Sequence, residues 1–321
     1  MTDSGTPALT ANGRLLETYA SAIQVAFFDL KDVEPLTLLG DGWDSVVVET
    51  AGGVVFRFPK RESVAAGYAK ERLLLPFLRG HLTPDIPIAG WEAGSQVDFR
   101  WGFHGYEKIA GQALHADVID EKNVDRLALA IGEFLFELHH FPADRARSFD
   151  VPGERVWRES HTALSRAVLP ILKRELRIRE FATVRRWWRG FLETDRHWDF
   201  EPALVHGNLV PEHLLVDRDA RNLVGVIDWA DAAVADAAID FVGLIGAYGT
   251  DFTWRVVEAY RSRGGSADGG LFARIRRLNA VVPFHAVRKS AVLRAEDEEE
   301  EAGEVLTAAV AALRAGPILA S

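Results

Sequence analysis

The sequence predicts an α+β protein with two lobes: a small N-terminal lobe built on an antiparallel sheet and a larger, mainly helical C-terminal lobe. Two runs rich in Val and Phe flank Ala51-Gly52-Gly53, which is typical of a β-hairpin. From residue 123 onward, apolar residues recur at three- and four-residue intervals, as in helices that pack on a core. Strands early in the chain and helices later favour an α+β fold.

The composition is that of an ordinary globular protein, with 48% hydrophobic and 26% charged residues in a chain of 321. No apolar run reaches the roughly eighteen residues of a membrane span, and the N-terminus lacks the basic and apolar regions of a signal peptide. The net charge of -10 argues against a nucleic-acid partner. Because cysteine is absent, disulfides and thiolate metal sites are excluded, and a reducing, cytoplasmic location is expected.

Individual elements follow from local patterns. A helix is expected over 13–30, then the hairpin, then an amphipathic helix over 63–82 and a strand that runs into a glycine-bounded connector within 99–111. In the hairpin, alternation places the two phenylalanines of "FRFPK" on one face and Arg57 on the other.

The rest of the chain is expected to be mainly helical. Asn123 is a plausible cap for a long helix that ends near residue 141, and 155–197 is helical and rich in Arg and Trp. Between 204 and 229 a strand, a loop and a strand are predicted. Strands joined there by a turn of roughly six residues should pair antiparallel.

Two features of the N-terminal segment suit phosphate. Small residues in "GDGWDS", 40–45, let backbone N–H groups approach a phosphate closely, although many such turns have no function and no Walker A lysine follows. Arg57, with Lys60 nearby, could hold phosphates, and Glu71 could pair with Arg57. Taken singly, these residues are equally typical of a solvated surface.

Polar residues also crowd between the apolar strands of 204–229. His213 and Asp228 could supply a nitrogen and an oxygen to a divalent cation, and Asn208 would lie where an alcohol waits. Magnesium prefers oxygen ligands, so a histidine is tolerable rather than ideal. The alternative interpretation is a turn histidine and a helix-capping aspartate.

Together these residues resemble the aminoglycoside and macrolide phosphotransferases, antibiotic kinases that share the protein-kinase fold. That family's signature is His-Gly-Asp, then Asn or His after four residues, and Ile-Asp about twenty residues later. This chain matches it with His206-Gly207-Asn208, His213 and Ile227-Asp228. The later Asp236 and Asp240 also fit the family's pattern. "FRFPK" is similar to the family strand that carries the phosphate-holding cation, and "YEKIAG" to its hinge.

The resemblance implies a bilobal protein-kinase-like fold, with a nucleotide-binding lobe at 1–105, a hinge at 106–111 and a catalytic, acceptor-binding lobe at 112–321. It implies phosphoryl transfer from GTP or ATP to a hydroxyl of a macrolide or an aminoglycoside. Site residues are implied for three roles. His213 and Asp228 hold Mg²⁺, while His206 and Asn208 take the catalytic positions. The nucleotide contacts are Gly40, Gly42, Ser45, Arg57, Glu71, Tyr106, Glu107, Lys108, Ile109 and Ile227.

The chain departs from the family at Asn208, which stands where the family has its catalytic aspartate. An amide can accept a hydrogen bond from an alcohol but cannot take its proton, and loss of a general base costs roughly 10²–10⁴ in rate. The chain as written is therefore expected to be impaired, and Asn208→Asp to raise turnover by at least about two orders of magnitude. A deliberate substitution or a natural pseudokinase would explain the amide, and the retained metal ligands and phosphate cation favour the first.

The acceptor pocket is expected between the helices of 155–197 and the C-terminal helices. Carboxylates of 296–301 would suit a polycationic aminoglycoside. Apolar walls would suit a macrolide, although core packing explains the same side chains: Trp187, Trp188, Trp254, Phe272 and Phe284. Three other functions stay open: an inactive nucleotide-binding sensor, a kinase of another hydroxylated metabolite, and a metal-dependent hydrolase that uses His206, His213 and Asp228.

Overall fold

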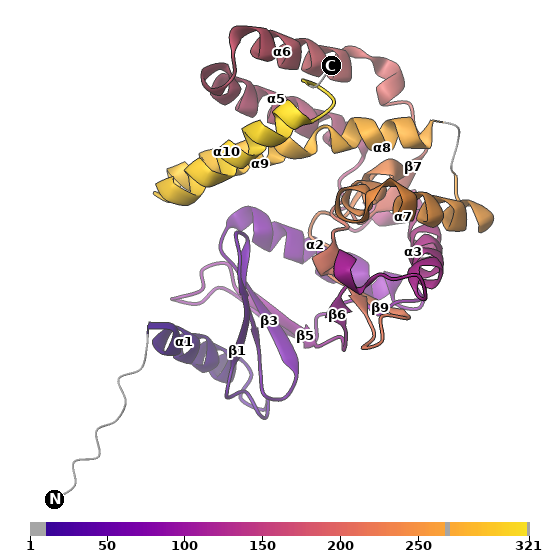
Figure 1. The fold of residues 1–321 in the computed structure, drawn as a ribbon. Helices are drawn as coiled ribbons and strands as arrows, with labels where there is room; N and C mark the ends of the chain where they lie inside the picture. Colours follow the sequence, from indigo (N-terminus) through magenta and orange to yellow (C-terminus); the bar gives the residue numbers. More distant parts are fainter. Residues whose placement is uncertain (1–10, 267–269, 320–321) are drawn as a thin grey trace, which may run out of the picture.

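Two lobes are evident in the structure, a computed structural model that describes residues 11–266 and 270–319 (Figure 1). The N-terminal lobe contains a five-stranded antiparallel sheet in the order β1-β2-β3-β5-β4. The first ten residues of the predicted N-terminal lobe lie outside the described part of the chain. The elements of this lobe are α1 (Ala11–Ala26), β1 (Thr37–Asp41), β2 (Ser45–Glu49), β3 (Val54–Pro59), α2 (Glu62–Leu78), β4 (Trp91–Ala93) and β5 (Phe103–Glu107).

The β2–β3 hairpin forms where Ala51-Gly52-Gly53 predicts it, with Val48 opposite Phe56. Alternation along β3 sends Phe56 and Phe58 into an apolar cluster, where the Phe58 ring lies 4.7 Å from that of Tyr19 on α1. Arg57 points to the opposite face, toward α2. The hairpin therefore fixes both the core of this lobe and the direction of its buried cation.

The C-terminal lobe is mainly helical, which confirms the predicted fold class. Among the described residues, none of the helices is long and apolar enough to cross a membrane. The elements are β6 (Gln112–Ala113), η1 (Ala116–Val118), α3 (Val124–His139), α4 (Ala143–Arg147), α5 (Glu154–Glu175), α6 (Ile178–Glu193), η2 (Asp195–His197), β7 (Pro202–Val205), η3 (Pro211–His213), β8 (Leu214–Val216), β9 (Leu223–Val226), β10 (Ala233–Asp236), η4 (Ala237–Phe241), α7 (Val242–Ser262), α8 (Leu271–Asn279), α9 (Val282–Ala295) and α10 (Glu299–Ala315).

Two small sheets in this lobe hold the loops of interest. Strands β8 and β9 pair antiparallel across the turn at 217–222, as predicted, and β6 joins them. The strand before the loop, β7, pairs instead with β10. The loop after β7 and the loop after β9 consequently start from different sheets and meet between them.

Asn123 does not cap α3 in the predicted way. It occupies the N-cap position, but its side chain makes no cap hydrogen bond. The Asn123 amide instead donates to the Val118 carbonyl, and its oxygen accepts from the Asp120 amide. Asn123 therefore fastens the preceding turn rather than the first turn of the helix.

A second connection joins the lobes away from the β5–β6 connector. The guanidinium of Arg61 forms two hydrogen bonds with Glu296, at the end of α9, with N–O distances of 2.9 and 3.0 Å. The same guanidinium stacks 3.8 Å above the ring of Trp43, and Lys289 of α9 lies 5.5 Å from that ring. The α9–α10 hairpin thereby reaches over to the N-terminal lobe (Figure 1).

Candidate active site

Asp228 connects the two lobes through its two carboxylate oxygens. Oδ1 accepts from Arg57 of β3 at 2.7 Å, and Oδ2 lies 3.2 Å from Nε2 of His213. Asp228 follows β9 and has a left-handed backbone with φ of 65°, a conformation that Asp tolerates better than most residues. That backbone turn directs the carboxylate between the lobes instead of along the strand.

Arg57 and Glu71 form a buried ion pair behind Asp228. The distance from Nη1 to Oε2 is 2.8 Å, and both residues are nearly inaccessible to solvent. Burial alone disfavours the Arg57 charge, but Glu71 and then Tyr68, whose ring lies 3.9 Å from the guanidinium, keep the pKa of Arg57 above its usual value. The arrangement predicted for these two residues is therefore present.

Nε2 of His213 faces Asp228 Oδ2 across 3.2 Å. Its Nδ1 lies 2.8 Å from the Asn208 carbonyl oxygen, which can only accept, so Nδ1 carries a proton and Nε2 is the nitrogen that could bind a cation. Adjacent ligands of an octahedral Mg²⁺ at 2.0–2.1 Å are about 3 Å apart, so these two side chains fit that ion.

Asp240 holds the loop between β7 and η3. Its Oδ1 accepts from the Gly207 amide at 2.8 Å, and its Oδ2 accepts from the His206 amide and lies 3.0 Å from Nε2 of His139. The Asp240 side chain is completely buried. A carboxylate without access to water needs such partners, and here they fix the loop geometry.

His206 positions the loop between β7 and η3. Its Nε2 lies 3.0 Å from the Ile227 carbonyl, and its Nδ1 accepts from the Asn208 amide at 3.4 Å. The residue is fully buried, and burial lowers the pKa of His206 to about 4. His206 therefore ties the loop to the β9 end as a neutral ring and is not available as a third metal ligand. The described residues contain no group of three or more His, Asp or Glu side chains arranged for a metal.

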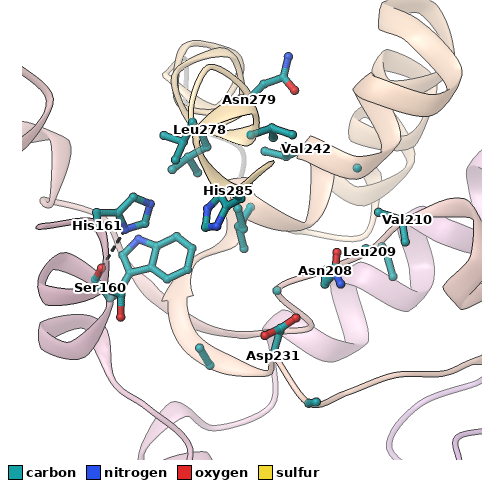
Figure 2. Close-up of a pocket in the computed structure, with 18 of the residues that line it drawn as sticks. Ser160, His161, Asn208, Leu209, Val210, Asp231, Val242, Leu278, Asn279 and His285 are labelled. Atoms are coloured by element: carbon teal, nitrogen blue, oxygen red, sulfur yellow. Dashed lines mark hydrogen bonds between the residues drawn. The ribbon is translucent and has the colours of Figure 1, made fainter. Parts of the chain in front are cut away.

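Asn208 lies beside a carboxylate to which the sequence motifs assign no role. Its side chain lies next to that of Asp231, three residues after Asp228, and both line one cavity (Figure 2). Lys70 of α2 fixes this segment, because its Nζ donates to the carbonyls of Ala230 and Ala232 at 2.6 and 2.7 Å. The acid in "IDWADA" is visible in the sequence, but only the packing against the 206–208 loop identifies it.

Lys60 holds the glycine loop, residues 40–45. It was expected to bind phosphates together with Arg57. Its Nζ donates to Asp41 Oδ1 at 2.6 Å and to the Gly42 carbonyl at 2.7 Å. Gly40 ends up on β1, Ser45 starts β2, and the Gly42 amide donates to the Ser45 carbonyl. Arg57 is therefore the cation of this pair that faces Asp228, and Lys60 belongs to the loop.

The predicted hinge residues have mixed environments. Tyr106 is buried, and this burial raises its pKa to about 12. The Lys108 amide already donates to the Gly53 carbonyl at 2.9 Å, so it cannot donate to a nucleobase without losing this bond. Glu107 is exposed at the end of β5, and Ile109 packs against Gly225 of β9.

Ile227 is the last residue predicted to contact a nucleotide. Its amide donates to the His213 carbonyl at 3.0 Å, and its own carbonyl oxygen lies 3.0 Å from Nε2 of His206. Both backbone groups are thus used to join the loop to β9, which leaves the half-buried Ile227 side chain for a ligand.

A cavity of about 830 Å³ opens next to Asn208 and Asp231. Figure 2 shows these two side chains on one side of it, with His161 and His285 across from them. Residues of α5, of the 207–212 loop, of α7 and of the α8–α9 junction line the cavity. Its charged residues are Lys70, Arg288, Asp231 and Glu212, and its apolar wall includes Val156, Trp157, Leu164, Leu209, Ile239, Val242, Leu278, Val281 and Val282.

The aromatic side chains expected in this wall lie elsewhere. Trp188 and Phe284 are fully buried and pack against each other at 4.8 Å, with Trp187 beside them. Trp254 packs on Phe272 at 4.8 Å, outside the cavity lining. The acidic run is also absent from the lining: Glu296, Glu299 and Glu301 pair with Arg61, Arg294 and Lys289.

Several known proteins resemble this chain. The uncharacterized protein YcbJ of Bacillus subtilis is 26% identical over 267 residues, which are 78% of this chain and 82% of YcbJ. Viomycin phosphotransferase of Streptomyces vinaceus is 28% identical over 238 residues, 71% of this chain and 75% of its own.

Solved structures agree with the fold. The GDP and kanamycin complex of APH(2")-IIIa matches with a TM-score of 0.79 and 29% identity, over 92% of this chain and 98% of the other. The apoenzyme of macrolide 2'-phosphotransferase MphH from Brachybacterium faecium matches in fold, with a TM-score of 0.66 and 21% identity over 91% and 98% of the two chains. Residues 35–278, three quarters of the chain, match the phosphotransferase enzyme family, and the chain belongs to that family.

Proposed function

We propose that this protein is a nucleoside-triphosphate-dependent O-phosphotransferase that phosphorylates a hydroxyl of an antibiotic. The observation that carries the proposal is Asp228, whose two oxygens meet the buried cation Arg57 and the loop residue His213 at the junction of the lobes. His213 and Asp228 are the residues that would hold Mg²⁺, which when bound neutralises phosphate charge. Arg57, kept charged and oriented by Glu71, would bind the phosphates of GTP or ATP.

The nucleotide is assigned to the space between the glycine loop and the 106–111 segment. Gly40, Gly42 and Ser45 would cover the phosphates. Tyr106 to Ile109 would face the base, with Ile227 below it. In support, the matched APH(2")-IIIa structure is a GDP complex.

The cavity lining favours a large, mostly apolar, hydroxylated acceptor such as a macrolide. Two cations, Lys70 and Arg288, balance two carboxylates, Asp231 and Glu212, so the lining has no excess negative charge for a polycation. An aminoglycoside is the second candidate, because the matched APH(2")-IIIa structure contains kanamycin. Either molecule would place its reacting hydroxyl beside Asn208.

Nucleotide binding is tested by thermal unfolding with GTP or ATP and Mg²⁺. A ligand at 100 times its Kd stabilises the folded state by about 2.7 kcal/mol, so the melting temperature should rise with one or both nucleotides. Arg57→Met should abolish this rise. An unchanged melting temperature for the original chain with both nucleotides would contradict the assignment.

Acceptor specificity is tested by mass spectrometry after incubation with GTP or ATP and erythromycin, kanamycin or viomycin. A gain of one phosphoryl group on erythromycin is expected, in accordance with the apolar lining. The same gain on kanamycin would instead favour the second candidate. Release of phosphate without any modified antibiotic would support a hydrolase.

A further inference from the structure

Residue 208 cannot accept a proton, but a carboxylate lies beside it. The side chains of Asn208 and Asp231 are neighbours, and both residues line the same cavity. Figure 2 shows the Asp231 carboxylate next to the Asn208 side chain at the end of the cavity. A hydroxyl placed within hydrogen-bonding distance of Asn208 would therefore also lie near Asp231.

Neighbouring segments on both sides fix the position of Asp231. Gly207 has φ of 85°, and a Cβ there would lie 2.5 Å from the Asp231 carbonyl oxygen, so the two segments are in close contact. The carbonyls on either side of Asp231 bind the buried Lys70. A carboxylate held on both flanks has little freedom to leave the cavity.

The environment of Asp231 also suits a base. Its side chain is accessible from the cavity, although protein atoms crowd around it. This crowding and the nearby Asp228 raise the pKa of Asp231, while Lys70 and His213 oppose the shift. A carboxylate of raised pKa takes a proton more readily than an ordinary one.

We propose that the Asp231 carboxylate is the proton acceptor for the attacking hydroxyl, in place of the aspartate that residue 208 lacks. This inference rests on the proposed phosphotransfer. The acceptor oxygen forms a bond to the γ-phosphorus as the bond between that phosphorus and the β,γ-bridging oxygen breaks. The hydroxyl proton passes to Asp231 and then to solvent, and the nucleoside diphosphate leaves. Asn208 orients the same hydroxyl by donating an amide N–H to its oxygen.

The test compares Asp231→Asn with Asp219→Asn, the matched loss of an exposed carboxylate in the 217–222 turn, outside the cavity lining. Phosphotransfer to erythromycin and kanamycin, and hydrolysis of GTP with water as acceptor, are measured with the full chain. Asp231→Asn should lower kcat by roughly 10²–10⁴ with the KM for GTP and the melting temperature unchanged. Asp219→Asn should behave as the original chain.

A second variant separates a chemical role from a structural one. Adding Asn208→Asp to Asp231→Asn returns a carboxylate to the neighbouring position and should restore kcat. In the original chain, Asn208→Asp should change kcat by less than about 10-fold, because a base is already present. This differs from the large gain expected if residue 208 alone supplied the base.

Three results would overturn the proposal. Asp231→Asn with full kcat removes Asp231 from the mechanism, while the proposed phosphotransfer stands. A lower kcat that accompanies a lower melting temperature, and that Asn208→Asp does not restore, makes Asp231 structural. An original chain that transfers phosphate neither to the antibiotics nor to water overturns the phosphotransfer itself, and this inference with it.

Discussion

At the scale of single residues, Arg57 is the positive charge that two carboxylates of the site share. It lies between Glu71 and Asp228, and it is the buried cation that neutralises Glu71. Removing one partner of a buried pair leaves the other charge without compensation, which typically costs about 3–5 kcal/mol.

We therefore expect Arg57→Met to lower the free energy of unfolding by about 3–5 kcal/mol, measured by urea denaturation. The control is Arg155→Met, which removes an exposed pair with Glu159 and should change stability by less than about 0.5 kcal/mol. Equal effects in the two variants would show that the Arg57–Glu71 pair is not buried as described.

Single residues also show how far sequence reasoning reaches. Two pairs were predicted, Arg57 with Glu71 and His213 with Asp228, and both are present. The ion pair of Arg57 with Asp228, which joins the two, was not predicted. The contact of Asn208 with Asp231 was not predicted. It depends on how two loops from different sheets pack, and no local pattern encodes that distance.

At the scale of elements, helix α7 supports the loop that carries Asn208. Gly243, in its first turn, is so close to this loop that a Cβ would overlap the Leu209 carbonyl oxygen. A Cβ added at Gly246, one turn later, would have no neighbour within 4 Å. The two glycines therefore allow a matched comparison within one helix.

Gly243→Ala should destabilise the protein by about 1–3 kcal/mol, since overpacking outweighs the usual helix preference for Ala. It should also reduce phosphotransfer, because Leu209 is adjacent to Asn208. Gly246→Ala should instead gain up to about 1 kcal/mol. Thermal and urea unfolding measure both, and a stabilised Gly243→Ala would mean that α7 does not press on the loop.

Elements differ in how well sequence predicts them. The β2–β3 hairpin and the β8–β9 pair were predicted because short turns leave few pairing choices. The partner of β7 was not predicted, since β10 lies beyond an intervening strand pair. Asn123 failed as a cap for a related reason: the Asp120 amide occupies the side-chain oxygen that a cap would use.

At the scale of the whole molecule, buried histidines should set the response to acid. Burial lowers the pKa of His104 to about 3 and that of His206 to about 4, whereas an unfolded histidine titrates near 6.5. As the pH falls below about 6.5, these histidines therefore bind protons in the unfolded chain but not in the folded chain. The free energy of unfolding decreases progressively as a result.

Each of these histidines should contribute a slope of about 1.4 kcal/mol per pH unit between pH 6 and 4.5. Urea denaturation at several pH values measures the slope, and His104→Gln should remove the part due to His104. A free energy of unfolding that stays level from pH 7 to 5 would contradict the buried, neutral state of these rings.

The Arg61–Glu296 contact, with Trp43 beneath it, has a consequence for how the protein releases its ligands. The tie joins the glycine-loop side of one lobe to the helical hairpin of the other, so the lobes separate only after it breaks. Because both partners remain accessible to water, salt weakens the attraction between them. A higher ionic strength should therefore speed up product release, whereas the rate of the chemical step should stay the same.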